Sequence, residues 1–296
     1  TVAIDYRETA PASASRDMFL DAQGRADPAL SRFDGKAIGV PGTVAGMALA
    51  LERFGTWTLA EAITPALRLA EEGFIVSRDL ADSLLALEER LRRWPSTRAV
   101  FFRGDERPIG TGELLRQPDL ARTLRLIAEQ GPDGFYRGEI AARIAAAVSE
   151  AGGIMTAEDL AVYRPRLRAP VLGSYRGHGI VSMPPPSSGG VHLVQMLNIL
   201  EGFPMGETGF GAAQTMHWMA EAMRRAYADR SQWLGDSDFV DVPLDGLTDE
   251  AYADALRATI DDFAVTPSEA ISPGDPTAYE SAETTHFSVV DAAGNA

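Results

Sequence analysis

Two adjacent threonines, Thr284 and Thr285, stand between a polar run and an apolar segment that is typical of a strand. Alternation along a strand places Thr284 and His286 on one face, but residues two apart are separated by roughly 6.6 Å. That separation is too long for a direct hydrogen bond between a catalytic base and the threonine hydroxyl. A threonine that begins a chain can instead use its own α-amino group as the base. This chemistry requires cleavage between Glu283 and Thr284.

The residues before Thr284 suit such a break. Residues 272–283, SPGDPTAYESAE, are polar and contain two prolines, so we expect an exposed loop. An α-amino group has a pKa of about 7.7–8.0, which leaves a useful fraction of it neutral near pH 7–8. The alternative is that Thr284 and Thr285 only mark the edge of an ordinary strand over 285–291.

Two further stretches carry groups suited to anion binding. Arg7 follows a predicted strand over residues 2–6, and it is either a surface charge or a bidentate clamp for a carboxylate. The motif PPPSSGG combines three prolines, which fix an extended backbone, with serines at the start of a predicted helix over 189–202. Helix N-terminal amides can bind an anion, and such a loop can equally serve only to position the helix. The residues alone leave these interpretations open.

No metal or phosphate site is expected from the motifs. None of the histidines has the spacing of a metal ligand set; they are His178, His192, His217 and His286. His192 and His217 lie in apolar helices, where packing is the expected role. The segment GKAIGVPGTVAG over 35–46 lacks GxGxxG spacing and a Walker lysine. It predicts a tight turn at Pro41-Gly42 with Thr43 as a helix cap.

The composition excludes several classes of partner. The chain has 296 residues, a net charge of −15 and a pI of about 4.7. This charge argues against nucleic acid or an anionic membrane surface as a partner, since both require clustered basic residues. No run of 18 apolar residues is present, so no membrane-spanning helix is expected. Without cysteine, the chain has no disulfide, thiolate metal site or cysteine nucleophile.

The hydrophobic pattern predicts a helix-rich middle flanked by strands. Helices are expected over 40–55, 58–73, 77–94, 119–131, 138–153, 156–163, 189–202 and 212–235. Strands are expected over 2–6, 37–40, 99–102, 170–176, 178–183 and 285–291. Thr58 and Glu61 have the spacing of a capping box, and Ser77 is a predicted helix cap. This order indicates an α+β fold in which the two terminal strands share a sheet.

Five stretches resemble the γ-glutamyltransferase family of N-terminal nucleophile hydrolases, whose members are also called γ-glutamyltranspeptidases or glutathione hydrolases. They are IDYRETAPASASRDMFLD, GVPGTVAGM, GPDGFYRGEIAARIA, MPPPSSGGVHLVQMLNILEG and TTHFSVVDAAGNA. The similarity covers essentially the whole chain, and five long motifs in order make it specific. It implies an α+β fold, the αββα sandwich of these hydrolases, incomplete in this chain and with a helix-rich large-subunit portion.

The resemblance also implies a role for particular residues. Residues 1–283 correspond to the core of a large subunit without its glycine-rich N-terminal segment, and residues 284–296 to the start of a small subunit. Thr284 would cleave the precursor and then attack a γ-glutamyl amide to form an acyl-enzyme, while Arg7 would hold the α-carboxylate of the glutamyl group. Further candidates for lining the site are Ser187, Ser188, Gly189, Gly190 and His286.

The expected partners follow from that chemistry. They are a small γ-glutamyl substrate such as glutathione, water or an amino acid as acceptor, and the remainder of the small subunit in a heterodimer. No cofactor or metal is implied, and the periplasm or the exterior of the cell is the expected location. The family's oxyanion-hole glycines, its supporting threonine and its amine-binding groups belong to the remainder of the small subunit, so the 296-residue chain alone is expected to be inactive.

Two alternatives remain open at this point. A cephalosporin or glutaryl acylase of the same superfamily shares the nucleophile and differs in whether the acyl group carries an α-amino group. The groups that would bind this amine belong to the small subunit, so the present residues do not decide. A non-catalytic relative would keep the fold without the activity, and Thr284, Arg7 and the PPPSSGG motif weigh against it.

Overall fold

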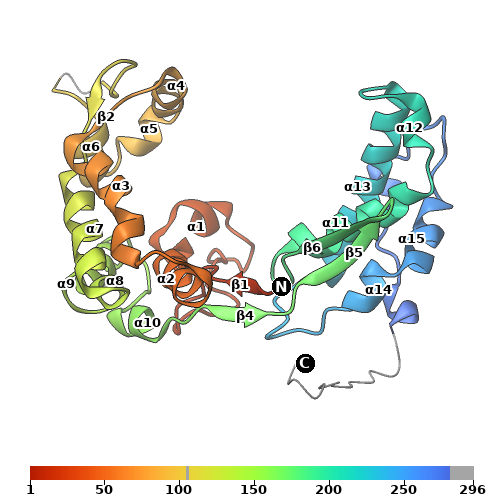
Figure 1. Cartoon of the computed structure of the whole chain (residues 1–296), viewed down its shortest axis with the longest axis horizontal. Coiled ribbons are helices and arrows are strands. Elements are labelled where there is room, and N and C mark those ends of the chain that lie inside the picture. The colour runs from red at the N-terminus through yellow and green to blue at the C-terminus, as the bar shows by residue number, and fades with distance from the viewer. Residues whose placement is uncertain (105–106, 281–296) are drawn as a thin grey trace. The chain divides into compact units, whose positions relative to one another are not determined.

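The computed structural model describes residues 1–104 and 107–280, which form two compact units (Figure 1). Residues 4–166 make up the N-terminal unit, and the described residues from 167 onward, together with residues 1–3, make up the C-terminal unit. The predicted strand over 285–291 lies outside the described residues, and so does the predicted subunit boundary at 283–284. Both units combine runs of helices with a few short strands, which confirms the α+β class.

The N-terminal unit is mainly helical. Its helices are α1 (Pro28–Phe33), α2 (Thr43–Phe54), α3 (Leu59–Glu72), α4 (Arg78–Ala86), α5 (Glu88–Leu91), α6 (Pro95–Phe101), α7 (Pro118–Gln130), α8 (Asp133–Tyr136), α9 (Gly138–Glu150) and α10 (Ala157–Val162), with a 3₁₀ turn at Gly35–Ala37. Strands β2 (Phe74–Ile75) and β3 (Leu114–Leu115) pair antiparallel. Strands β1 (Ala3–Asp5) and β4 (Arg166–Arg168) each include residues on both sides of the boundary between the two units.

Local capping signals set several helix starts in this unit. Thr58 and Glu61 form the predicted capping box at α3, in which each side chain accepts from the other residue's backbone N–H. The Ser77 side chain accepts from a backbone N–H in the first turn of α4, also as predicted. At α2, however, the N-cap residue is Gly42 and no side chain caps the helix, so the prediction of Thr43 as a cap is wrong.

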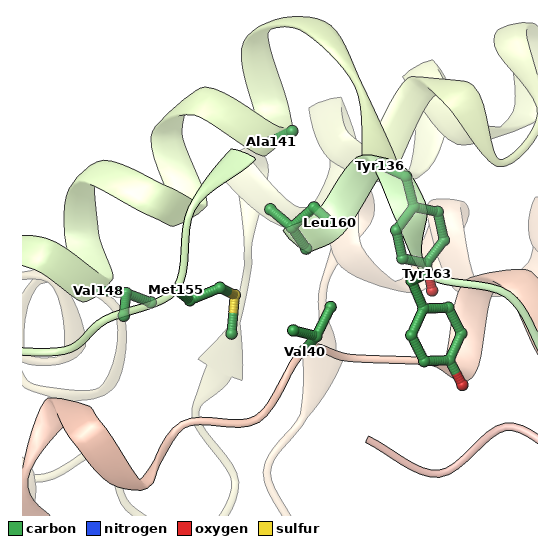
Figure 2. Packing of buried hydrophobic residues seen from close by; sticks show 7 residues of the cluster. All are labelled: Val40, Tyr136, Ala141, Val148, Met155, Leu160 and Tyr163. Carbon is green, nitrogen blue, oxygen red and sulfur yellow. The ribbon is translucent and has the colours of Figure 1, made fainter. Parts of the chain in front are cut away.

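The core of the N-terminal unit places α8, α9 and α10 over the segment that carries Val40 (Figure 2). Ala141 and Val148 lie two helical turns apart on α9, so they face the same side. The cluster consists of Val40, Tyr136, Ala141, Val148, Met155, Leu160 and Tyr163. Leu160 is fully buried, and burial of such a side chain stabilises a fold by roughly 1.5–3 kcal/mol. The two tyrosines lie at the end of this core that reaches the strand β1 segment.

The C-terminal unit joins a hairpin to a group of helices (Figure 1). Its elements are β5 (Val171–Tyr175), β6 (His178–Ser182), α11 (Ser188–Glu201), α12 (Met205–Thr208), α13 (Ala213–Trp233), α14 (Leu244–Thr248), α15 (Glu250–Arg257) and 3₁₀ turns at Ser268–Ala270 and Pro276–Tyr279. The hairpin turn has positive φ at Arg176 and Gly177, which is the conformation that matches the twist of a two-residue hairpin. Helix α11 packs against β5, α13, α14 and α15, and it is therefore the centre of this unit.

Three predicted elements differ from the structure. Residues 99–102, expected as a strand, lie at the end of α6, because Pro95 begins a helix there and a short apolar run does not distinguish helix from strand. Residues 37–40 form no strand, and only Val40 makes a single bridge, to Thr9. The helix expected over 77–94 ends at Ala86, and α5 follows as a separate helix.

No helix within 1–104 and 107–280 combines the length and the apolar character that crossing a membrane requires.

Candidate functional site

Arg7 lies directly after strand β1, and its backbone is fixed at two points. Its carbonyl oxygen accepts from the Tyr163 hydroxyl at 2.8 Å, and its N–H donates to Asp5 Oδ1 at 3.2 Å. The guanidinium lies 3.8 Å from the Glu8 carboxylate, and both side chains are more than half exposed. Such an exposed ion pair contributes little to the stability of the fold. The side chain of Arg7 therefore stands on a fixed backbone and can exchange its contact with Glu8 for another carboxylate.

The tyrosine that holds Arg7 is itself held by a second tyrosine. The rings of Tyr163 and Tyr136 lie against each other (Figure 2), and they stack with centroids 5.7 Å apart and an interplanar angle of 7°. The Tyr136 hydroxyl donates to the Pro41 carbonyl at 2.8 Å and accepts from the Ala45 N–H at 3.3 Å. Burial raises the pKa of both phenols, so both remain protonated hydrogen-bond donors at neutral pH.

The glycines of GVPGTVAGM allow the start of α2 to approach this segment closely. A methyl group at Gly42 would overlap the Tyr163 hydroxyl and the carbonyl oxygen of Tyr6, and one at Gly46 would overlap the Tyr6 side chain. Only glycine fits such an approach without a shift of its neighbours. The close approach of Tyr6 and Tyr163 therefore accounts for both glycines.

The PPPSSGG motif forms the entry to α11. The Ser187 hydroxyl oxygen accepts from the Gly189 N–H at 3.2 Å and caps the helix, while the Gly189 carbonyl accepts from the Ser182 hydroxyl at 3.2 Å. A methyl group at Gly190 would overlap the Met183 carbonyl oxygen. These contacts explain Ser187 and Gly190 as parts of a rigid helix entry. Ser188 lies in the first turn of the helix, beside them.

The predicted site residues thus fall into separate groups. Ser187, Ser188, Gly189 and Gly190 lie together at the start of α11 in the C-terminal unit, and Arg7 belongs to the N-terminal unit. Thr284 and His286 lie outside the described residues. Among residues 1–104 and 107–280, no group of three or more acidic or histidine side chains has the arrangement of a metal site.

Comparison with known proteins identifies the chain. The γ-glutamyltranspeptidase family model matches residues 1–296. The chain belongs to this family.

Three members or relatives of the γ-glutamyltranspeptidase family illustrate the match. Glutathione hydrolase proenzyme of Escherichia coli (strain K12) is 51% identical over 297 residues, which cover 100% of this chain and 51% of that protein. Acylase ACY 1 proenzyme of Pseudomonas sp. (strain SE83) is 42% identical over 301 residues, covering 99% of this chain and 53% of that protein. The crystal structure of Helicobacter pylori γ-glutamyltranspeptidase matches with a TM-score of 0.90 at 46% identity, covering 95% of this chain and 81% of that one.

The chain therefore spans about half the length of the glutathione hydrolase and acylase proenzymes that it matches. The structural match to the Helicobacter pylori protein extends the confirmed α+β class to the fold of the γ-glutamyltranspeptidases. The resemblance stated from the sequence motifs is thereby confirmed.

A buried polar network in the C-terminal unit was not predicted from the sequence. Glu221, Arg225 and Asp229 lie on one stripe of α13, and each is at most 4% exposed. Glu221 pairs with Arg225 at 2.7 Å, and the Asp229 carboxylate accepts from the side chain of Gln195 on α11. The spacing of four, which places these three charged residues on one face of the helix, was the signal that could have indicated this stripe.

His192 extends the network on α11. It is buried, as expected for a packing histidine, and its Nδ1 lies 2.9 Å from Gln195 Oε1. Since Gln195 donates its amide N–H to Asp229, its oxygen accepts here, and His192 therefore carries its proton on Nδ1. Nε2 has no hydrogen-bond partner among the residues that the structure describes. Desolvation lowers the pKa of His192, so the ring is neutral at pH 7.

Proposed function

We propose that this chain is part of an enzyme that hydrolyses or transfers the γ-glutamyl group of glutathione and related γ-glutamyl amides. The observation that carries the proposal is the 51% identity, across all of this chain, to a protein named glutathione hydrolase proenzyme. The word proenzyme also supports maturation by cleavage. We place that cleavage between Glu283 and Thr284, where the sequence offers a nucleophile that becomes a chain terminus.

In the proposed maturation, the Thr284 hydroxyl oxygen attacks the carbonyl carbon of Glu283. The peptide C–N bond breaks, the nitrogen takes up the hydroxyl proton, and water hydrolyses the resulting ester. The reaction releases the carboxylate of Glu283 and the α-amino group of Thr284, which then serves as the base for catalysis. The cleaved parts would remain together as a heterodimer of a large and a small subunit.

In the proposed catalytic cycle, the Thr284 hydroxyl gives its proton to its own α-amino group and attacks the γ-carbonyl carbon of the substrate. The amide C–N bond breaks and the leaving amine takes the proton, which leaves a γ-glutamyl ester on Thr284. Water or an amino acid then cleaves that ester. Arg7 would hold the α-carboxylate of the glutamyl group in a bidentate pair, and its fixed backbone and exposed guanidinium support this role.

The PPPSSGG motif is a further candidate for the wall of this site. Ser188 lies in the first turn of α11, where backbone N–H groups point outward from the helix. His286 remains a candidate on the residues alone. The family resemblance also supports a location in the periplasm or outside the cell, and this location is proposed on that ground.

The second candidate function is a glutaryl or cephalosporin acylase, which the 42% identity to acylase ACY 1 proenzyme favours. The two functions differ in whether the acyl group needs an α-amino group. We would express the full-length protein and compare kcat/KM for γ-glutamyl p-nitroanilide and glutaryl p-nitroanilide. The proposal predicts a clear preference for the γ-glutamyl substrate, and a preference for the glutaryl substrate would replace it by the acylase function. Thr284→Ala is the inactive control for both.

A further inference from the structure

The segment that precedes the expected cleavage bond is tied to helix α13. The Gly274 N–H donates to Asp229 Oδ1 at 2.7 Å, and the Trp233 indole N–H donates to the Gly274 carbonyl at 3.0 Å. Both backbone polar groups of Gly274 are therefore bound by side chains of one helix. A methyl group at Gly274 would overlap the Tyr252 hydroxyl, so the segment also packs closely on α15.

Asp229 is suited to hold this segment because its carboxylate is completely buried and both of its oxygens accept hydrogen bonds. Its Oδ2 accepts from the Tyr252 hydroxyl at 2.7 Å and from the Gln195 amide, in addition to the bond from Gly274 to Oδ1. A buried carboxylate without such donors would cost several kcal/mol. Burial raises the pKa of Tyr252, so its hydroxyl remains a donor. The network therefore fixes the position of Gly274 relative to α11, α13 and α15.

A second set of contacts fixes the segment six residues further on. The Gly246 N–H in α14 donates to Glu280 Oε1 at 2.7 Å. Pro276 is buried, and a methyl group at Gly246 would overlap its carbonyl oxygen. The Tyr279 ring packs against the Tyr252 ring, with centroids 5.3 Å apart. The chain is thus held on α14 as well as on α13, up to the last residue that the structure describes.

The distance along the chain from this anchor to the expected cleavage bond is short. Thr284 follows Glu280 by four residues, and a fully extended chain spans at most about 3.5 Å for each residue. A chain of four residues can therefore bridge at most about 14 Å from Glu280. Because so few residues separate the two, we expect a change at the anchor to affect the reaction at the cleavage bond, since small errors of position have large effects on intramolecular reactions.

We propose that Asp229 and Glu280 are positioning residues for self-cleavage, which hold residues 274–280 so that the Glu283–Thr284 bond is presented to the precursor's own reacting groups. The inference rests on the proposed function, because it takes the cleavage bond from there. The proposed anchor acts on the peptide chain before cleavage. It therefore affects the rate of maturation and leaves the turnover of the mature enzyme unchanged.

The test measures the rate of self-cleavage of freshly purified full-length precursor by intact-mass spectrometry. Glu280→Ala removes the acceptor for the Gly246 N–H and is expected to slow cleavage about tenfold, the order of effect of one hydrogen bond. Glu280→Gln keeps an amide oxygen at the same position and is expected to cleave near the wild-type rate. Glu269→Ala is the matched control, because Glu269 is an exposed acidic residue that precedes Glu280 in the sequence, in the 3₁₀ turn Ser268–Ala270.

Two further measurements separate the anchor from general folding and from the proposed function. Thermal unfolding of each precursor shows whether the exposed Glu280 side chain matters for stability, and kcat/KM of the cleaved fraction with γ-glutamyl p-nitroanilide is expected to equal that of the wild type. Cleavage of Glu280→Ala at the wild-type rate, or equal slowing by Glu280→Gln, overturns the anchor. A wild-type precursor that does not split before Thr284 overturns the proposed function instead.

Discussion

The two units hold their functional segments with different chemistry. In the N-terminal unit, the carbonyl oxygen of Arg7 is bound by a neutral group, the hydroxyl of a stacked tyrosine, and its N–H is bound by the carboxylate of Asp5 two residues before it. In the C-terminal unit, Gly274 is positioned by the buried carboxylate of Asp229, which serves three donors at once.

The two units should therefore differ in how mutations affect them. A neutral hydrogen bond contributes about 0.5–1.5 kcal/mol, and its loss leaves only one carbonyl without that donor. Loss of a buried carboxylate leaves several donors unsatisfied together. We therefore expect the Arg7 region to respond to mutation mainly in substrate binding, and the Asp229 region to respond mainly in stability.

The largest effect is expected from Asp229→Ala. The change leaves the Gln195 amide, the Tyr252 hydroxyl and the Gly274 N–H without their acceptor, so the free energy of unfolding should fall by about 3 kcal/mol or more. Chemical denaturation of the full-length protein measures it. Asp254→Ala is the control, because Asp254 forms an exposed ion pair on α15 that is worth less than about 1 kcal/mol. Equal effects of the two changes would contradict the comparison.

Arg7→Ala should have the next largest effect, on substrate binding. Loss of a bidentate pair to the α-carboxylate is expected to raise KM for γ-glutamyl p-nitroanilide by about 10- to 100-fold, with little change in stability because the side chain is half exposed. Arg7→Lys keeps the charge without the planar fork and should fall between the two. Steady-state kinetics measure these KM values. A wild-type KM in Arg7→Ala would show that Arg7 does not bind the α-carboxylate of the substrate.

Tyr163→Phe should act in the same direction with a smaller effect. It removes the donor to the Arg7 carbonyl and keeps the ring stack on Tyr136. A KM increase of about fivefold with kcat unchanged is expected, since one hydrogen bond contributes about 1 kcal/mol. Tyr227→Phe, at an exposed position on α13, is the control. A drop in kcat and stability without a change in KM would show that Tyr163 serves the fold alone.

The smallest effect is the pH dependence due to His192. Desolvation lowers the pKa of His192 in the folded protein, and the positive charge of Arg230 lowers it further. The hydrogen bond with Gln195 and the negative charge of Asp229 raise this pKa, but desolvation is the largest cause. In the unfolded chain the ring takes up a proton near pH 6.5, so the unfolded state binds more protons below that pH. The free energy of unfolding should therefore fall as the pH drops from about 7.5 to about 5.5. Thermal melts at both pH values should show a smaller decrease in Tm for His192→Leu than for the wild type. An equal decrease in the two proteins would show that His192 does not cause this pH dependence.

Much of the local structure could be predicted from the sequence. Ser77 and the pair Thr58 and Glu61 mark helix starts within a few residues, so their effect is visible in a short window. The order of the five motifs indicated the family because such long stretches in sequence are specific. The error at residues 99–102 has a different source, since a four-residue apolar run has no period from which helix or strand can be decided.

The contacts that position the functional segments could not be predicted, because their partners are distant in the sequence. The role of Gly42 becomes clear only when Tyr163 and Tyr6 are seen beside it. Asp229 is bound by residues of α11, α15 and the segment before Glu280, which no local pattern connects. The chemistry of Thr284 is a prediction from the sequence, whereas the anchor proposed upstream of it rests on contacts in the folded C-terminal unit.

The most direct test of the account is the covalent state of the full-length protein after purification. Intact-mass spectrometry and N-terminal sequencing should show two polypeptides, the smaller of which begins Thr284-Thr285-His286, while Thr284→Ala should remain a single uncleaved chain. An active wild-type preparation with an intact Glu283–Thr284 bond, or a smaller polypeptide that begins at another residue, would contradict it.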